Sequence, residues 1–299
     1  VTSGLGWVYR RRQRAKQEDV TGGGRMNPML IWVSLFATLM SKISYLSMPG
    51  ESLGKGPVNM TTMFAYPLVF LIVAYGLLPL YMKYRVTSAY ELLEMKLGLS
   101  VRLLGASMFL VLRLVWMSLL VYLTGKALTT MLDIGEGWVP LIVLATSIVA
   151  VTYTSLGGLR AVVITDFAQT VLLFGGAILV LVTISIRMGG VGWFPTEWHP
   201  IWDTQPIFST NLATRVTVVG SILNVLVGYV CTTGGDQTSI QRFMATSDTR
   251  SARIALATQL AVSVIVGVTL GMVGFALLGY FEANPHLLEG MSLKDDADK

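Results

Sequence analysis

Of the 299 residues in the chain, 53% are hydrophobic and only 13% are charged, and the mean hydropathy is +0.64. The charged residues gather between long apolar runs, which excludes a soluble globular domain and indicates a membrane protein with several spans. The formal net charge of +5 does not indicate a nucleic-acid partner, because the basic residues are distributed as membrane topology requires.

Basic residues precede the first complete apolar run and recur after the second, fourth and sixth runs, whereas the alternate loops carry more acidic residues. By the positive-inside rule the basic loops are cytoplasmic. About seven runs reach the ~20 residues that a spanning helix needs. We therefore expect a multi-pass protein of the plasma membrane, of the bacterial inner-membrane type, whose partner is the lipid bilayer and not a nucleic acid.

The chain opens with residues 1–26, which read as the end of a preceding helix followed by a basic cytoplasmic linker, and the missing starting Met suggests a fragment. Residues 27–46 form the first complete span and residues 61–82 the second. A short amphipathic helix follows, with Thr87 or Ser88 as its N-cap and Glu91 in its first turn.

Residues 103–132 form a long span that carries Arg113, and residues 138–155 return through the membrane. The segment Leu156–Arg160 is expected to be a tight cytoplasmic turn into the span of residues 161–186. The outer loop, residues 188–211, holds Trp193, Trp198 and Trp202, which suit the membrane–water interface. Residues 212–230 lead to a polar segment, residues 252–281 form the last span, and residues 282–299 are an acidic outer tail.

Two of these spans are interrupted by polar residues where a membrane helix should be most regular. Residues 35–56 begin as an apolar run and then fill with Ser41, Lys42, Ser44, Pro49 and Gly50, and residues 231–238 read CTTGGDQT. Unpaired backbone groups are costly in hydrocarbon, so broken helix is tolerated only where it lines a cavity or binds a ligand. Interrupted spans in corresponding positions of two halves indicate the binding site of a secondary transporter with inverted repeats.

An enzyme is poorly supported. Cys231 is the single cysteine, which excludes a disulfide within the chain, and the two histidines lie in different outer loops. The sequence shows no Cys/His cluster, no nucleophile–base arrangement and no phosphate-binding loop. It predicts no enzymatic activity and no organic cofactor.

Taken together, these motifs resemble those of the sodium/solute symporter family, which includes sodium-coupled transporters of sugars, monocarboxylates, iodide, proline and sialic acid. The matching segments are Gly23-Gly24-Arg25; Ser34-Leu35-Phe36-Ala37 with Pro49-Gly50-Glu51; Val86-Thr87-Ser88-Ala89-Tyr90-Glu91; Leu156-Gly157-Gly158-Leu159-Arg160-Ala161-Val162 with Thr165-Asp166 and Gln169; and Asp236-Gln237 with Gln241-Arg242. The resemblance implies an all-α membrane protein, an inverted-repeat helical bundle whose repeats each begin with a broken helix. It places the first five-helix repeat at residues 27–187 and the first two helices of the second repeat at residues 212–281, after which the fold is truncated.

The resemblance also implies a sodium site. The backbone carbonyls of Ala37 and Met40 match one half of the family's principal sodium site, and the other half would come from a helix beyond this chain. Carbonyl oxygens freed by unwinding suit a hard cation. Asp166 matches a family carboxylate of a second ion site or inner gate, although it could instead sit at the interface and pair with Arg160. Sodium is the only metal or cofactor expected.

The residues expected to contact the solute lie at the two breaks and on the third predicted span. They are Ser41, Lys42, Ser44, Arg113, Thr232, Thr233, Asp236 and Gln237. Sugar-transporting members carry Asn and His where this chain has Leu39 and Ser44, which disfavours glucose or galactose. Sialic acid transporters use hydroxyl residues at positions that match Ser41 and Ser44, and a carboxylate-binding arginine where this chain has Trp116.

Each of these assignments has an alternative. Arg113 lies one turn from Trp116 and could bind a carboxylate bidentately, or it could be a helix-buried arginine paired to a carbonyl. Lys42 could bind an anionic solute, replace a sodium ion, or point into the vestibule beside Glu51. The hydroxyl residues could instead bond back to their own helices and allow close packing.

The sequence therefore predicts a sodium-coupled symporter that imports a small polar or anionic organic solute by alternating access. Two alternatives remain open. One is a solute-sensing membrane domain of a signalling protein. The other is a sodium-independent transporter in which Lys42 takes the place of the ion.

Overall fold

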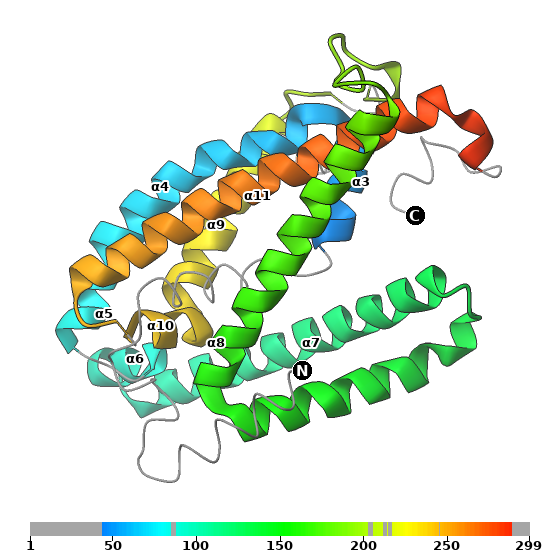
Figure 1. Cartoon of the computed structure of the whole chain (residues 1–299). Helices are drawn as coiled ribbons and strands as arrows, with labels where there is room; N and C mark the ends of the chain where they lie inside the picture. The colour runs from blue at the N-terminus through cyan, green and yellow to red at the C-terminus, as the bar shows by residue number, and fades with distance from the viewer. Residues whose placement is uncertain are drawn as a thin grey trace. The chain divides into compact units, whose positions relative to one another are not determined.

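The computed structural model describes residues 44–84, 88–202, 206–211, 214, 217–244 and 246–288, with the side chains of residues 46, 89 and 153–164 left out (Figure 1). In these residues the regular elements are all helices, which agrees with the predicted all-α class. In chain order they are α3 (Ser44–Lys55), η2 (Gly56–Ala65), α4 (Tyr66–Leu71), η3 (Ile72–Leu77), α5 (Leu78–Tyr84), α6 (Ala89–Leu97), α7 (Leu99–Met131), η4 (Glu136–Trp138), α8 (Val139–Arg187), η5 (Pro200–Trp202), α9 (Val218–Gly235), α10 (Gln237–Met244), α11 (Thr249–Ala283) and η6 (Pro285–Leu288).

Within the described residues, five helices are long and apolar enough to cross a membrane. They are Ser47–Tyr84, Leu99–Met131, Thr165–Arg187, Val218–Gly235 and Thr249–Ala283, and Glu136–Thr152 is a shorter apolar helix. These helices confirm a membrane protein with several spans. The predicted first span, residues 27–46, lies almost wholly outside the described residues.

The predicted turn at Leu156–Arg160 is wrong, because α8 is a single helix of 49 residues through this segment. The segment contains Gly157 and Gly158, yet the helix continues through both residues.

The helix after the first predicted break also extends further than expected. Pro49 lies inside α3 together with Gly50, so these residues do not belong to an unwound segment. The chain turns instead at Gly56, whose φ of +68° is in the left-handed region that favours glycine. The corner between α3 and η2 therefore lies six residues beyond Gly50.

The helical segment after this corner changes pitch along its length. Residues 56–65 form a ten-residue 3₁₀ helix, followed by α-helix and then by six residues of π-helix at Ile72–Leu77. The hydroxyls of Thr61 and Thr62 donate to the carbonyls of Val58 and Asn59, three residues earlier, at 2.6 and 2.9 Å. A 3₁₀ run of this length is unusual, and π-helical turns occur frequently at functional sites.

The chain divides into two compact units. Unit 1 comprises residues 1–35, 77–167 and 233–255, and unit 2 comprises residues 36–76, 168–232 and 256–299. In unit 1, Tyr81 of α5 and Ile240 of α10 form a buried apolar cluster, against which Leu92 of α6 packs. The hydroxyl of Ser88 accepts a hydrogen bond from the Tyr90 amide at 3.2 Å, which confirms Ser88 as the N-cap of α6.

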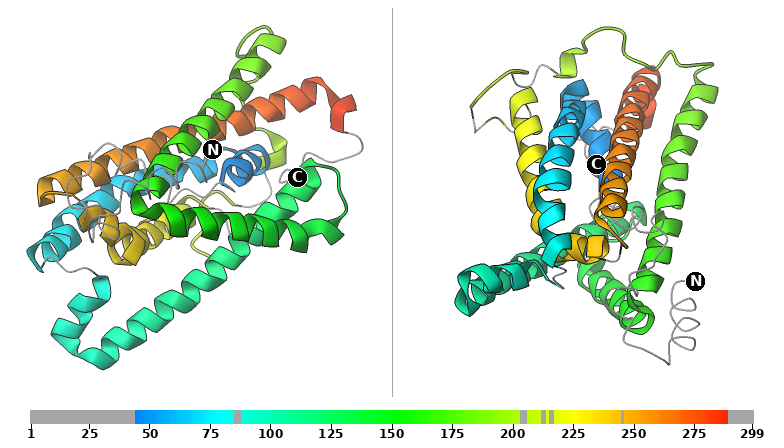
Figure 2. Two further views of the ribbon diagram at one scale, coloured as in Figure 1. Left: turned by 60° about the horizontal axis from the view of Figure 1, so that its bottom comes forward. Right: turned by 90° about the vertical axis from the view of Figure 1, so that its left-hand side faces the viewer.

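In unit 2, α11 is the helix against which the other elements pack. Figures 1 and 2 show α4 and α11 running side by side. The backbone of α3 approaches α11 closely at Gly274, where a Cβ atom would lie 2.3 Å from the Pro49 carbonyl oxygen and 2.9 Å from the Ser52 Cβ. Only a residue without a side chain permits this backbone contact, which is the mode of helix packing favoured in membranes.

Two of the three tryptophans in the loop between α8 and α9 are buried within unit 2. Trp193 and Trp202 are 6% and 4% exposed, and both belong to a buried cluster with Leu53 of α3 and Phe275 of α11. Trp198 alone of the three stays largely exposed, at 41%. Trp193 and Trp202 are therefore part of the core of unit 2, and their predicted place at the membrane–water interface stays a prediction.

We predict that Gly274→Ala destabilises the protein by about 1–3 kcal/mol, because overpacking forces α3 away from α11. The measurement is thermal unfolding of purified protein in detergent. The matched control is Gly175→Ala on α8, where a Cβ atom meets nothing within 4 Å and where alanine favours the helix. Equal unfolding temperatures for the two variants would contradict the contact at Gly274.

Candidate functional site

The second predicted break, residues 231–238, is present in the structure only at Asp236, because residues 231–235 are still helical. Helix α9 ends at Gly235, α10 begins at Gln237, and Asp236 lies between them. The Tyr81 hydroxyl donates to the Gly234 carbonyl at 2.7 Å, and Oδ1 of Asp236 accepts from the Thr238 amide at 2.7 Å and from its hydroxyl at 2.5 Å. Backbone groups freed by the break are thus partly satisfied within unit 1.

Asp236 also faces Arg113, which comes from the middle of α7. Nη1 of Arg113 lies 3.7 Å from Oδ2 of Asp236, and both side chains are partly buried. Two of the predicted solute-binding residues are therefore brought together by the fold, and they form an ion pair with one another. A solute carboxylate at Arg113 would compete with the Asp236 carboxylate for the same guanidinium.

A second arginine lies in the same part of unit 1. Arg242 of α10 is 8% exposed, and its guanidinium donates to the Thr238 carbonyl at 2.9 Å. Burial lowers the pKa of Arg242, Asp166 of α8 raises it, Arg113 lowers it, and Asp236 raises it. We call Arg113, Asp166, Asp236 and Arg242 the charge cluster; it contains two cations and two anions, so the buried guanidinium has opposite charge nearby.

A tyrosine borders the charge cluster. The pKa of Tyr90, on α6, is raised to about 12, first by burial and then by the negative charge of Asp236 and by Tyr81. The phenol is therefore neutral at physiological pH and can donate a hydrogen bond. This part of unit 1 contains groups that can hold a small ion or a polar solute group, or can pair with one another.

The remaining predicted site residues are placed as follows. Thr233 is fully buried, and its hydroxyl has no hydrogen-bond partner among the described residues. Thr232 is exposed and donates to the Gly228 carbonyl at 2.8 Å. Gln237 is the first residue of α10 and Ser44 the first of α3. Ala37, Met40, Ser41 and Lys42 lie outside the described residues.

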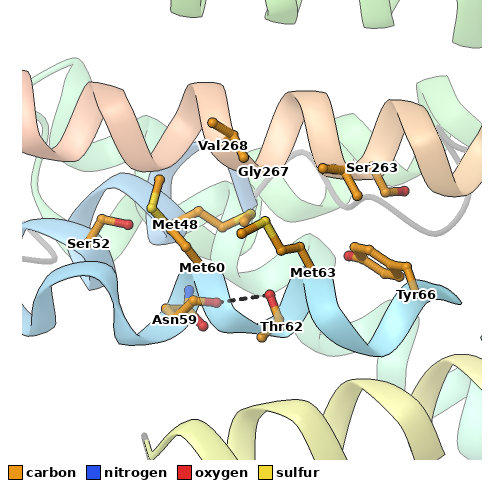
Figure 3. Close-up of a pocket in the computed structure, with 11 residues that line it drawn as sticks. Met48, Ser52, Asn59, Met60, Thr62, Met63, Tyr66, Ser263, Gly267 and Val268 are labelled. Carbon is orange, nitrogen blue, oxygen red and sulfur yellow. Dashed lines mark hydrogen bonds between the residues drawn. The ribbon is translucent and has the colours of Figure 1, made fainter. Parts of the chain in front are cut away.

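Unit 2 contains a small pocket between α3, η2 and α11 that sequence reasoning missed (Figure 3). Its volume is about 20 Å³, enough for about one water-sized group. None of the eleven described residues that line it is charged: they are Met48, Ser52, Asn59, Met60, Thr62, Met63, Tyr66, Ser263, Val264, Gly267 and Val268. Figure 3 shows Met48, Met60 and Met63 gathered in the space below α11, with the hydroxyl residues around them.

The polar groups of this pocket are partly committed to the backbone. The Thr62 hydroxyl donates to the Asn59 carbonyl, and the Ser263 hydroxyl donates to the Gln259 carbonyl at 3.0 Å. The Tyr66 ring packs edge-on against Tyr229, with ring centroids 5.2 Å apart. Hydroxyl oxygens with their protons committed in this way still accept hydrogen bonds, so the pocket suits a polar group that donates.

Gln259, one turn before Ser263 on α11, is the other polar residue that sequence reasoning missed. It is fully buried, and neither its amide nitrogen nor its amide oxygen has a hydrogen-bond partner among the described residues. A buried, unsatisfied amide is costly, and its presence calls for a missing partner. The available signal was the i, i+4 spacing of Gln259 and Ser263 within an otherwise apolar run.

An open apolar groove of about 280 Å³ lies beside the pocket. It is lined by side chains of η2, α4 and α11, and it shares Met63, Tyr66 and Val264 with the pocket. These three side chains form the wall between a partly polar pocket and an apolar groove. The flexible thioether of Met63 allows that wall to adapt to what lies on either side.

A family model described as the sodium:solute symporter family matches residues 20–294 of the chain. The chain belongs to this family. It is therefore a transporter-family chain and not an enzyme, and the family couples solute transport to Na⁺.

Relatives with different solutes are similar to this chain. A sodium/sialic acid symporter of Proteus mirabilis is 28% identical over 297 residues, covering 95% of this chain and 57% of the relative. The human sodium/iodide cotransporter is 30% identical, covering 99% of this chain and 46% of the relative. The human sodium-coupled monocarboxylate transporter 1 is 27% identical, covering 82% and 40%. The chain thus spans about half the length of the curated relatives that it matches.

The structure matches a solved sodium-coupled sialic acid symporter in a substrate-bound, outward-open state. The TM-score is 0.83 at 24% identity, and the match covers 99% of this chain and 63% of the solved chain. This likeness shows that the chain shares the fold of that symporter. The identity of the solute is addressed separately by the chemistry of the site.

We predict that Asp166 and Arg242 stabilise unit 1 jointly. A double-mutant cycle with Asp166→Asn and Arg242→Gln should give a coupling energy of about 1–3 kcal/mol in unfolding measurements, because each single change leaves a buried charge less compensated.

The matched control is the ion pair between Glu94 and Arg102, whose side chains are 37% and 41% exposed. Its cycle should give about 1 kcal/mol or less, since solvent screens exposed pairs. A coupling between Asp166 and Arg242 no larger than this control would contradict their joint role.

Proposed function

We propose that this chain forms part of a sodium-coupled symporter that imports a small polar or anionic organic solute by alternating access across the plasma membrane. The observation that carries the proposal is the pair of polar features on α11. These are the pocket at Ser263 and the buried, unsatisfied amide of Gln259 one turn away. A membrane helix that buries such groups without partners retains them for a ligand that is bound during the working cycle.

The proposed sodium ligands are the backbone carbonyls of Ala37 and Met40, with Asp166 serving a second ion or the inner gate. Support comes from the family match and from the oxygen chemistry that Na⁺ requires. Sodium that binds the outward-open form more tightly would raise solute affinity there, and a coupling of about 1–3 kcal/mol is enough to link the two.

The residues proposed to contact the solute come from both predicted breaks. Ser41, Lys42 and Ser44 belong to the first break, and Thr232, Thr233, Asp236 and Gln237 to the second. Arg113 is the proposed carboxylate anchor, and its distance to Asp236 supports a role in which an anionic solute exchanges places with that side chain. Within unit 2, the uncharged lining of the pocket near Ser263 supports the binding of a polar, uncharged group there.

We expect uptake of the correct solute into proteoliposomes to depend on an inward sodium gradient. The intact transporter should be tested with radiolabelled sialic acid, iodide, lactate and biotin, with sodium or potassium outside and with proteoliposomes that lack protein as the control. Sodium should raise the initial rate at least tenfold, because the gradient supplies the driving force. Equal rates in sodium and potassium would contradict sodium coupling and favour the alternative in which Lys42 replaces the ion.

We predict that Gln259→Leu raises the thermal unfolding temperature but lowers sodium-driven uptake at least tenfold. Leucine removes an unsatisfied buried amide, which stabilises the fold, and it also removes the proposed ligand group. Thr269→Val on the same helix is the control, because the Thr269 hydroxyl is exposed and bonds back to the Ile265 carbonyl at 2.8 Å. A stabilised Gln259→Leu protein with unchanged uptake would remove Gln259 from the binding site.

A further inference from the structure

The loop between α8 and α9 makes a polar contact with the end of α3. Nε1 of Trp202 donates to the Leu53 carbonyl at 2.9 Å. Leu53 lies in the last turn of α3, where carbonyls have no partner within the helix. Trp202 therefore acts as a C-cap supplied from a segment about 150 residues away in the sequence.

The indole ring also fits the corner that follows α3. A Cβ atom on Gly56 would lie 2.6 Å from Cδ2 of Trp202, so the ring occupies the space that any other residue would fill. The positive φ of Gly56 and the ring position exclude a side chain for independent reasons. The corner and the ring are matched in shape.

The other side of the indole is supported by α11 and by the loop itself. The ring centroid of Trp202 lies 5.6 Å from that of Phe275 and 5.2 Å from that of Trp198. Nδ1 of His199 accepts from the Ile201 amide at 3.2 Å, so its Nε2–H donates to Glu282 of α11 at 2.5 Å. The loop is thus tied to α11 next to the residue that caps α3.

These contacts reach the wall of the pocket without entering it. Ser52, the neighbour of Leu53, lines the pocket, as does Met60, which also packs against the buried cluster that contains Trp202. Trp202 itself is not among the lining residues. A shift of Trp202 would therefore move Ser52 and Met60, although Trp202 does not line the pocket itself.

We propose that Trp202 is a positioning residue for the solute pocket: by capping α3 and filling the corner at Gly56, it sets the positions of Ser52 and Met60. The loop between α8 and α9 thereby controls access to the pocket from a residue that does not touch the solute. This inference rests on the proposed function, in which that pocket receives part of the solute.

The test uses a cysteine in the pocket as a reporter that needs no identified solute. Cys231, the single cysteine of this chain, and any cysteine in the rest of the transporter are replaced by serine. Ser263→Cys is added, and the rate of reaction with N-ethylmaleimide is measured on the intact transporter in nanodiscs, with and without sodium. Trp202→Phe keeps an aromatic ring but removes the indole N–H. Phe208→Leu in the same loop is the matched control, because the Phe208 side chain is 75% exposed.

Trp202→Phe should raise the reaction rate about fivefold, the change in population that corresponds to the loss of one ordinary hydrogen bond. Phe208→Leu should leave the rate unchanged. A rate for Trp202→Phe equal to that of the parent would overturn the positioning role. Unfolding temperatures measured on the same samples distinguish a displaced pocket wall from general loosening, which would raise the rate in both variants in proportion to lost stability.

Glu282→Gln provides an independent second variant, because it weakens the same loop through a partly exposed side chain that cannot prevent folding. A raised rate supports the proposal, and an unchanged rate counts against it. The proposed function can fail independently of this inference. If sodium neither changes the reporter rate of the parent nor drives uptake, sodium coupling is contradicted. The effect of Trp202→Phe on the reporter rate can still be measured in that case.

Discussion

The contact between the backbones of α3 and α11 at Gly274 determines the arrangement of unit 2. Without a side chain at this position, the Pro49 carbonyl and Ser52 lie directly against α11. The consequences follow in order along the chain. Met48 and Ser52 of α3 reach the pocket on α11, the chain turns at Gly56, and η2 returns along the same helix. Water and lipid are excluded from this contact, so dispersion and close packing hold it together in place of the hydrophobic effect.

Charge, in contrast, organises unit 1. Arg242 is buried on the short helix α10, and a buried guanidinium is tolerated only when opposite charges and hydrogen-bond acceptors surround it. Asp166 and Asp236 supply the charge, and the Thr238 carbonyl supplies an acceptor. Asp236 can join the charge cluster because it lies at the break between α9 and α10. In a continuous helix its side chain would point in a different direction. An interrupted helix and a charge cluster are thus two aspects of one local structure.

Local features of the structure could be predicted from the sequence, and features that depend on distant segments could not. The break at Asp236 follows from Gly-Gly-Asp within an apolar run, and the N-cap at Ser88 from the residues after it. The segment Leu156–Arg160 was misread because a glycine pair permits either a turn or a continuing helix, and only the rest of the fold decides between them. The burial of Trp193 and Trp202 was not predicted for the same reason: an indole is buried when a partner helix is available, and no local pattern reports that helix.

The candidate site shows the same division. The family resemblance singled out Asp166, Asp236 and Arg242 as motif residues, but the distance between Arg113 and Asp236 depends on how α7 packs beside the break. The pocket at Ser263 was missed because its lining comes from α3, η2, α4 and α11. The first three are separated from the lining residues of α11 by about 200 residues, and each element looks apolar by itself. The first break, with Ala37, Met40, Ser41 and Lys42, stays a prediction.

The change of pitch between Gly56 and Leu77 has a mechanical consequence. A residue in a 3₁₀ helix advances about 2.0 Å and turns about 120°, whereas an α-helical residue advances about 1.5 Å and turns about 100°. Each residue that changes from 3₁₀ to α-helix therefore shortens the segment by about 0.5 Å and rotates the residues beyond it by about 20°. Met63 and Tyr66 lie on either side of the boundary between the 3₁₀ helix and the α-helix. A gain or loss of one 3₁₀ residue would therefore rotate these two side chains relative to each other, while the backbone stays hydrogen-bonded.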